Sequence, residues 1–566
     1  MTRFAAAGAL SVLLLFALPS SGRTASPESG LDALLARRIR HVFVIYQENR
    51  SFDNEFGTFP GADGIWSATA RAHGFEQRDW IKKTIVTPFR TDDPDVFYQV
   101  NNRQFQIAAS NRGKMNEFVS QQEHAFYSYG GKENSEEAWS VGVQSMSHVD
   151  CTVVPYLWAY AHRFALFDDF FQALRGPSTP SNVEIIAAQN GLTQWARHPK
   201  EKSADVYAPG VPVFSNLDPA FGPYNPSDLL EAQPHQIDQT YATILLGLER
   251  ADAPKASLDN DDVREDQAAV ARLGAPIPWR WYQEGYGTET HAGFITHHAA
   301  PQFFGYVADN DSMRSKLLDL QTFYADVAQG RLPASGLFYL KGGSQNGLGL
   351  HPVNPDPLVQ RFYEGDDDHP GYADMQISEA AVASLVNAIA QSPYWNDSAI
   401  VITWDDPGGF WDHVPPPGWE RCPDGYPCGD GERVPAIVIS PFAKSGAVVH
   451  DLSDQTSVLK FVETVFRQPP LASLPDEKPY LPRGPRDGNA ELSNLSGAFD
   501  AGRLAGTAPP LPASTAIFPD ATIRTLPAPV TCAQIGVTPV PPPAGYDDAP
   551  PKGWKSRPFA TWPHPN

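Results

Sequence analysis

Residues 41 to 53 read His-Val-Phe-Val-Ile-Tyr-Gln-Glu-Asn-Arg-Ser-Phe-Asp. The first seven are mostly β-branched or aromatic and predict a buried strand, which ends where the chain turns polar at Glu48 and Asn49. Residues 399 to 404, Ala-Ile-Val-Ile-Thr-Trp, form a second such run, followed by Asp405 and Asp406. The two runs predict buried strands that carry acidic side chains at their carboxyl ends.

Further elements follow along the chain. Two more strands are expected, at 434 to 440 and, more weakly, at 336 to 340, and helical patterns cover 312 to 329, 378 to 391 and 456 to 466. Apolar strands that alternate with helices are typical of an α/β fold, with a mostly parallel sheet sandwiched by helices. Because ligands bind such sheets beyond the carboxyl ends of the strands, the acidic strand ends mark the place to expect a site.

The beginning of the chain has the pattern of a secretory signal peptide, which we place at residues 1 to 24. Arg3 supplies a positive charge, residues 4 to 18 are apolar, and small residues follow. An uncleaved membrane anchor is the alternative, but this apolar run is short for a bilayer span of about 20 residues. No arginine pair precedes the run, which argues against a twin-arginine route. We expect bacterial export to a secreted or periplasmic location, with no stable membrane span.

The remaining chain divides by composition. Residues 25 to 495 are expected to form the main domain, with a weakly patterned stretch at about 196 to 290 interpreted as an insertion over the sheet and part of a lid. Residues 496 to 566 are rich in proline, and this tail either lies along the surface or acts as a spacer. The formal net charge of −22 and the lack of a Lys/Arg-rich stretch argue against nucleic acid as a partner, and we expect none. An anionic substrate would then need a local cation.

The four cysteines fit an exported protein with disulfides. Cys422 and Cys428 flank a turn-rich loop that a disulfide could close. Cys151 could then pair with Cys532, or it could be a buried free thiol. The chain has no CxxC pair, which argues against a cysteine zinc site.

The two acidic strand ends could supply oxygen ligands for a metal ion. Glu48 and Asn49 follow the first strand, where the alternative is an ordinary loop acid and a turn cap. Asp405 and Asp406 are adjacent carboxylates at a buried strand end, a costly arrangement without a cation. A solvated turn is the alternative for this pair, although the Gly-Gly sequence that follows it suits a backbone passing close to a site.

Ser178 and three histidines complete the candidate chemistry. Ser178 stands in the turn Gly-Pro-Ser-Thr-Pro at 176 to 180, which is either a plain loop or the place of a nucleophile. A neighbouring metal would lower the pKa of its hydroxyl and activate it. His297, His298 and His369 could bind a phosphate group or protonate a leaving group, although a lone histidine is more often structural.

These segments together resemble the bacterial phosphoesterase family of secreted acid phosphatases and phospholipases C, within the alkaline-phosphatase superfamily. The most specific matches are Glu-Asn-Arg-Ser-Phe-Asp at 48 to 53 and Asp-Asp-Pro-Gly-Gly-Phe-Trp-Asp-His-Val at 405 to 414. Further matches are Gly-Lys-Met-Asn at 113 to 116, His-Pro-Gly-Tyr at 369 to 372 and Arg-Val-Pro-Ala at 433 to 436. All of them run in the family's order, from about 40 to 470.

The resemblance implies that residues 25 to 495 are a phosphoesterase catalytic domain with an alkaline-phosphatase-like fold. Five residues would bind one or more divalent metal ions: Glu48, Asn49, Ser178, Asp405 and Asp406. Their ligand atoms are compatible with Ca²⁺, Mg²⁺, Mn²⁺ or Zn²⁺. Ser178 would be the nucleophile and form a covalent phosphoserine. His297, His298 and His369 would surround the phosphate, with His298 and His369 catalytic, and His413 would orient Asp406.

Three functions are compatible with this resemblance. The first, which we favour, is hydrolysis of phosphate monoesters of the acid-phosphatase type. It is favoured because phospholipase members more often place Glu at the position of Asp406 and extend into C-terminal β modules. The alternative is a phospholipase C or other phosphodiesterase that acts on phospholipid head groups. The second alternative is an inactive exported binding protein on the same fold, against which the intact Ser178 and acidic pairs argue.

One departure from the family leaves a phosphate contact unassigned. The family often has a histidine ahead of the Gly-Lys-Met segment, but residues 92 to 106 contain none. Asp93, Asp95, Tyr98 and Asn101 lie in this stretch instead. The turn after Ser178 also differs, with Ser-Asn where the phospholipases usually show Asn-Arg.

Overall fold

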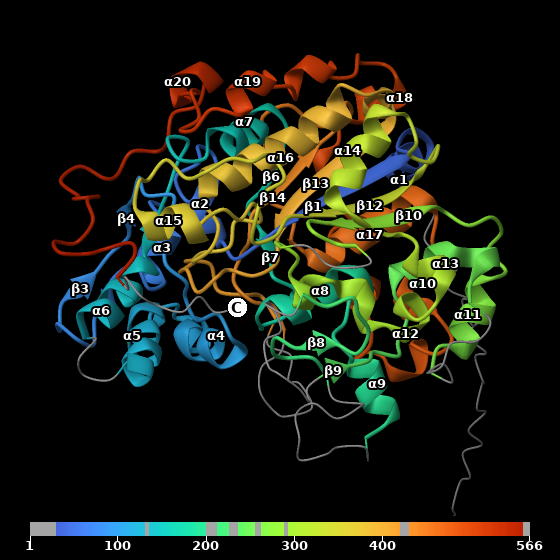
Figure 1. Cartoon of the computed structure of the whole chain (residues 1–566), viewed down its shortest axis with the longest axis horizontal. Coiled ribbons are helices and arrows are strands. Elements are labelled where there is room, and N and C mark those ends of the chain that lie inside the picture. Colours follow the sequence, from blue (N-terminus) through green and yellow to red (C-terminus); the bar gives the residue numbers. More distant parts are fainter. Residues whose placement is uncertain are drawn as a thin grey trace, which may run out of the picture.

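The computed structural model describes residues 30–130, 135–199, 212–225, 236–254, 262–287, 292–418 and 429–558. A sheet of eight strands crosses the centre, in the order β11-β10-β12-β1-β13-β14-β6-β15 (Figure 1). Its strands are β1 (His41–Gln47), β6 (Ala165–Phe167), β10 (Trp279–Gln283), β11 (Leu317–Asp319), β12 (Gly336–Lys341), β13 (Ser398–Trp404), β14 (Ala436–Ile439) and β15 (Ala447–Val449). Only β14 among them runs antiparallel to its neighbours, so the predicted mostly parallel sheet is confirmed.

The two strands that carry the acidic ends lie side by side. Both contain only buried residues, as their apolar sequences predict. In their parallel register Gln47 pairs with Trp404, so that Glu48 and Asp405 leave the sheet at the same level. The two acidic segments therefore begin next to one another at one edge of the sheet.

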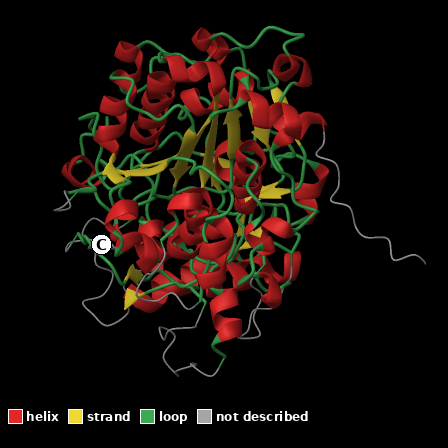
Figure 2. Ribbon diagram, turned by 90° about the vertical axis from the view of Figure 1, so that its right-hand side faces the viewer, coloured by secondary structure: helices red, strands yellow, loops and turns green. Residues whose placement is uncertain are grey.

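Helices cover both faces of the sheet (Figure 2). Phe43 contacts Phe323 of α14 (Leu320–Ala328) edge-on, with 6.1 Å between ring centroids. Tyr46 donates a 3.1 Å hydrogen bond to the Ser181 carbonyl of α8 (Ser178–Ala187). Since alternate strand residues point to opposite faces, α14 and α8 lie on opposite sides. The helices α7 (Pro155–Arg163) and α16 (Met375–Ala390) share the side of α14, and α1 (Gly30–Arg38) and α17 (Gln455–Phe466) share that of α8.

Two predicted elements differ from the structure. The helix expected at 312 to 329 is divided into α13 (Asp311–Arg314), the edge strand β11 and α14. β10 falls inside the stretch interpreted as an insertion, yet it pairs with β11 and β12 in the central sheet. Its sequence, Trp-Arg-Trp-Tyr-Gln, places a charged residue between buried tryptophans and so lacks the apolar run that marks β1.

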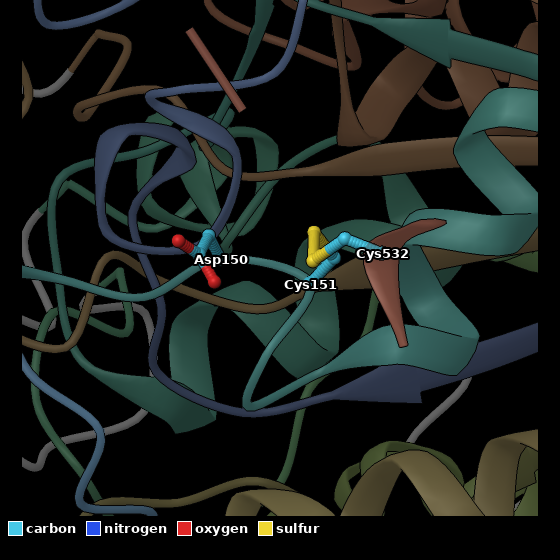
Figure 3. A group of neighbouring side chains, drawn as sticks. All are labelled: Asp150, Cys151 and Cys532. Carbon is cyan, nitrogen blue, oxygen red and sulfur yellow. A yellow bond between two sulfur atoms is a disulfide. The ribbon is translucent and has the colours of Figure 1, made fainter. Parts of the chain in front are cut away.

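The proline-rich tail lies along the main domain. It forms the short helices α18 (Ala501–Ala505), α19 (Asp520–Ile523) and α20 (Cys532–Ile535), drawn in red at the top of Figure 1. A disulfide joins Cys532 to Cys151, with 5.4 Å between the Cα atoms, across 381 residues of sequence (Figure 3). This pairing was one of the two predicted alternatives for Cys151. Cys422, Cys428 and the signal peptide at 1 to 24 lie outside the described residues.

None of the helices in the described part of the chain is both long and apolar enough to span a bilayer.

Candidate active site

Polar side chains gather where β1 and β13 end. The side chains of Glu48, Asp405 and Asp406 are fully buried there. The Asn49 backbone N–H donates a 2.9 Å hydrogen bond to Asp405 Oδ1, and Asn49 adopts a left-handed backbone with φ of 61°. Such a conformation is uncommon outside glycine and is often held at functional sites. A Cβ at Gly408 would lie 2.1 Å from the Asn49 carbonyl oxygen, which explains why a glycine stands two residues after Asp406.

Ser178 lies against this group, as the first residue of α8. Its hydroxyl is 3.4 Å from Asn49 Oδ1 and 3.4 Å from Asp406 Oδ2, and the residue is 1% exposed. Gln172 holds the turn through a 2.7 Å hydrogen bond from Nε2 to the Gly176 carbonyl oxygen. The N-terminus of the ten-residue helix α8 therefore carries Ser178, where the helix dipole favours an anion. The five predicted metal ligands thus lie together.

The orientation of the Asn49 amide follows from His369. Nδ1 of His369 lies 2.7 Å from the Pro370 carbonyl oxygen, which can only accept, so Nδ1 carries a proton. Burial lowers the pKa of His369 to about 4, so the ring is neutral and its Nε2 bears a lone pair. The Asn49 amide atom 2.8 Å from Nε2 is therefore the nitrogen donor. The oxygen of the amide then faces the carboxylates.

The resulting cluster of oxygens fits a cation. Asn49 Oδ1 lies 3.0 Å from Asp405 Oδ1, 3.1 Å from Asp406 Oδ2 and 3.3 Å from Glu48 Oε2. Asp405 Oδ2 is buried without a hydrogen-bond partner in the part of the chain that the structure describes. Burial and then the Glu48 charge raise the pKa of Asp405, and burial is also the main cause that raises the pKa of Asp406 to about 8. Clustered carboxylate and amide oxygens are suitable ligands for a hard divalent ion.

Lys341, at the end of β12, also belongs to the site, although the sequence interpretation missed it. Its buried ammonium group forms an ion pair with Glu48 Oε1, and His298 Nδ1 lies 3.2 Å from the same oxygen. Burial, the largest single influence, would raise the pKa of Glu48, but Lys341, the hydrogen bond with Asp405 and His369 together lower it. Glu48 is therefore held ionised, with Oε2 left to face Asn49 and Asp405. The only sequence signal for Lys341 was a basic residue directly after the strand predicted at 336 to 340.

Two of the three predicted histidines contact the acidic cluster, His298 at Glu48 and His369 at Asn49, and His297 lies next to His298. His298 contacts Glu48, and burial followed by the His297 charge lowers its pKa well below the usual value. His297 and His298 lie on a short 3-10 turn (Thr296–His298), with 4.3 Å between their ring centroids, rather than on a strand. His369 uses both ring nitrogens, on Pro370 and Asn49, so it orients Asn49 in this state. Contact with a phosphate would require one of these bonds to be given up.

Asn101 occupies the histidine-free stretch and reaches the site. Its Nδ2 lies 3.0 Å and 2.9 Å from the two carboxylate oxygens of Asp406, and the residue is 4% exposed. The Gly408 backbone N–H adds a 2.7 Å hydrogen bond to Asp406 Oδ1. Tyr98, from the same stretch, stacks parallel to His369, with 6.0 Å between ring centroids, and Tyr372 stacks on His369 at 4.3 Å. The sequence named Asn101 and Tyr98 but assigned neither a role.

His413 does not orient Asp406, contrary to the prediction. Its Nδ1 lies 2.7 Å from Asp53 Oδ2 and its Nε2 lies 3.3 Å from Asp63 Oδ1, so neither nitrogen remains for Asp406. Burial disfavours a charge on His413, but these carboxylates outweigh it and raise its pKa to about 9. Arg433 binds Asp53 at 3.0 Å and Asp412 at 2.9 Å. His413 thus belongs to a separate, internally neutralised cluster.

One further group of acids and cysteines is not a metal site. Asp150 lies near Cys151 and Cys532, but the two sulfur atoms are joined in the disulfide and offer no thiolate (Figure 3). The Asp150 carboxylate instead contacts Arg90 Nε at 3.0 Å and the Thr152 backbone N–H at 2.8 Å. This group therefore needs no cation.

Curated relatives of this chain are phospholipases C. The hemolytic phospholipase C of Pseudomonas aeruginosa is 24% identical over 76% of this chain and 53% of its own length. The non-hemolytic phospholipase C of Burkholderia pseudomallei is 23% identical over 89% of this chain and 63% of its own length. Phospholipase C B of Mycobacterium tuberculosis is 23% identical over 76% of this chain and 74% of its own length. The chain spans between half and two thirds of the first two relatives.

Solved structures similar to this chain are distant. A protein in the alkaline phosphatase superfamily from Vibrio parahaemolyticus is 10% identical, covering 76% of this chain and 66% of its own, with a TM-score of 0.29. The family assignment rests instead on a family model, described as the Phosphoesterase family, which matches residues 39–469. This range contains every predicted site residue, and on this match the chain belongs to the Phosphoesterase family.

Proposed function

We propose that the protein hydrolyses phosphoric esters, with Ser178 as the nucleophile and a divalent cation held by Glu48, Asn49, Asp405 and Asp406. The carrying observation is the cluster of side-chain oxygens around Asn49 Oδ1, all within 3.3 Å and beside a buried serine hydroxyl. Membership of the Phosphoesterase family and the names of the phospholipase C relatives support the same class of reaction.

The bound cation would neutralise charge on the phosphoryl oxygens and lower the pKa of the serine hydroxyl. Asp406 holds the Ser178 hydroxyl by a 3.4 Å contact, and Lys341 keeps Glu48 ionised beside it. The N-terminus of α8 adds positive potential where the phosphoryl group would bind. These groups orient the nucleophile and favour the anion before any bond changes.

The reaction would proceed in two displacements. Ser178 Oγ forms a bond to phosphorus while the ester P–O bond breaks, and the electron pair leaves with the alcohol oxygen, which takes a proton. Water then attacks the phosphoserine, the Ser178 O–P bond breaks, and the hydroxyl regains its proton. His298 is the proposed proton carrier, because its ring is neutral and its Nδ1 faces Glu48, which leaves Nε2 as the basic nitrogen.

For the substrate we propose a phosphate monoester. Ser178 is 1% exposed. A phosphate monoester carries one organic substituent on phosphorus and a diester carries two, so the monoester fits more easily against so buried a nucleophile. The second candidate is a phospholipid head-group diester, as the names of the relatives suggest. The two tyrosines that stack with His369 favour it, because partly exposed aromatic faces attract a quaternary ammonium group.

A substrate panel tests both candidates. We expect the metal-loaded protein to hydrolyse p-nitrophenyl phosphate at a higher kcat/KM than phosphatidylcholine in vesicles. Faster release of phosphocholine from the lipid would reject the monoester in favour of the diester. Turnover of neither substrate with Ca²⁺, Mg²⁺, Mn²⁺ or Zn²⁺ would contradict the proposed function.

A further inference from the structure

The stretch that carries Asn101 to the site has no regular structure of its own. Residues 91 to 102, between β4 (Phe89–Arg90) and α4 (Arg103–Ser110), form neither helix nor strand. Yet Asp95 is fully buried, Phe97 is 5% exposed and Asn101 is 4% exposed. Buried backbone groups outside helices and strands need partners from elsewhere in the protein. The position of Asn101 therefore depends on what holds this stretch.

The C-terminal tail supplies several of those partners. Arg557 Nη1 donates to the Asp95 carbonyl oxygen at 2.7 Å and to both carboxylate oxygens of Asp93 at 2.8 Å. The Phe97 backbone N–H donates to the Ser556 carbonyl oxygen at 2.9 Å, and the Ser556 hydroxyl bonds to Asp93. The tail thus contacts residues 93, 95 and 97 in turn.

Arg557 also neutralises an acidic group beneath the stretch. Burial, and then the neighbouring Asp374 carboxyl, raise the pKa of Asp95 to about 9, so these two buried acids share a proton. Asp374 in turn caps α16 by accepting from the Gln376 backbone N–H at 2.7 Å. Arg557 faces both Asp93 and Asp95, with 3.8 Å to the Asp95 carboxylate. Loss of this cation would leave Asp93 charged beside the buried pair.

The tail reaches this place along a continuous path. Asp548 accepts from the Arg90 backbone N–H at 2.9 Å and contacts His148 at 3.0 Å. Trp554 donates from its indole N–H to the Ser140 carbonyl oxygen at 3.0 Å and contacts Phe89 edge-on. Residues 548 to 557 therefore lie against the segment that enters the site from β4.

We propose that Ser556 and Arg557 are positioning residues of the active site. They fix residues 93 to 97, and through them Asn101 against Asp406 and Tyr98 against His369. This inference rests on the proposed function, because Asp406 is a proposed metal ligand. It gives the proline-rich tail a role in the chemistry in addition to its surface contacts, and it assigns to Asn101 the orientation of Asp406 that was predicted for His413.

A double-mutant cycle distinguishes positioning from general stabilisation. The variants are Arg557→Gln, Asn101→Ala and the pair, and kcat/KM with p-nitrophenyl phosphate is measured for each. We expect Asn101→Ala to lower kcat/KM by about 10- to 100-fold and Arg557→Gln by about 10-fold. The pair should be within about twofold of Asn101→Ala alone, since residues that act through one contact are not additive. Arg557→Lys should recover part of the loss.

The matched control is Arg524→Gln, another tail arginine, which donates to the Leu348 carbonyl oxygen at 2.9 Å. Arg524→Gln should leave kcat/KM unchanged both in the wild-type protein and in the Asn101→Ala variant. Mn²⁺ binding by calorimetry gives a readout apart from activity, and we expect Kd to rise about 3- to 10-fold in Arg557→Gln but not in Arg524→Gln.

Wild-type kcat/KM and Mn²⁺ Kd in Arg557→Gln would overturn the inference, as would losses that multiply in the pair. If the wild-type protein turned over no phosphate ester, the proposed function would fail, and the Mn²⁺ measurement would still decide this inference.

Discussion

Two clusters of buried acids lie near one another at the carboxyl edge of the sheet, and they are neutralised differently. Among the residues that the structure describes, Glu48, Asp405 and Asp406 have one ammonium group, Lys341, for three carboxylates. In the other cluster Asp53 and Asp412 face Arg433, and His413 carries a raised pKa of about 9. The first cluster lacks two positive charges when its carboxylates are ionised, whereas the second has a cation for each of its two buried acids.

The difference between the clusters shows where a cation is needed. Buried carboxylates are costly unless charges and hydrogen bonds compensate them. Arg433 and His413 satisfy the acids of the second cluster within the chain itself. In the first cluster Asp405 Oδ2 finds no donor among the described residues, and Asn49 turns its oxygen toward the carboxylates. One divalent ion would supply the two missing charges.

The largest expected effect concerns the hydroxyl beside the first cluster. Ser178→Ala should lower kcat by at least about 10⁴-fold, because the nucleophile is removed, while the melting temperature and metal content stay near wild type. Stopped assays with p-nitrophenyl phosphate measure kcat, and thermal unfolding and elemental analysis of the same sample measure the melting temperature and the metal content. Substantial turnover by this variant would show that another group attacks phosphorus.

The next largest effect is a loss of stability when the second cluster loses the positive charge of Arg433. Arg433→Gln leaves Asp53 and Asp412 buried without their guanidinium, and we expect a loss of about 3–5 kcal/mol in the free energy of unfolding. Urea unfolding followed by tryptophan fluorescence measures this loss. A variant as stable as wild type would mean that the network does not depend on the Arg433 charge.

The smallest expected effect is a change in Mn²⁺ affinity when Lys341 is replaced. Lys341→Met removes the ammonium group that pairs with Glu48 and makes the first cluster more negative, so we expect lower stability without metal but about tenfold tighter Mn²⁺ binding. Lys341→Arg, which keeps the charge, serves as the control. Weaker Mn²⁺ binding by the methionine variant would instead indicate that Lys341 mainly shapes the ligand geometry.

The sequence predicted the frame of the site well. β1 and β13 are apolar throughout, so their positions and the meeting of Glu48 with Asp405 follow from the strand pattern and the parallel register. The place of Ser178 came from the family resemblance rather than from its turn, which looks like many loops. β10 was missed because Arg280 interrupts its apolar residues, and β11 was missed because three residues are too few to show a period.

The electrostatic details were harder to predict, since they depend on contacts between distant segments. Lys341 and Glu48 are 293 residues apart and meet only because β12 and β1 are neighbours. Asn101 reaches Asp406 across 305 residues through a stretch without regular structure. His413 follows Asp406 closely in sequence, and this proximity suggested a contact that Asp53 and Asp63 prevent.

The most direct measurement of the central claim is the divalent metal content of Asp405→Asn beside that of Asp412→Asn. Both variants neutralise one fully buried aspartate at the same edge of the sheet. After equilibration with Mn²⁺ and gel filtration, we expect about one equivalent of metal in the wild type and in Asp412→Asn, and almost none in Asp405→Asn. Unchanged metal in Asp405→Asn, or loss of metal only in Asp412→Asn, would contradict the assignment of the cation to the first cluster.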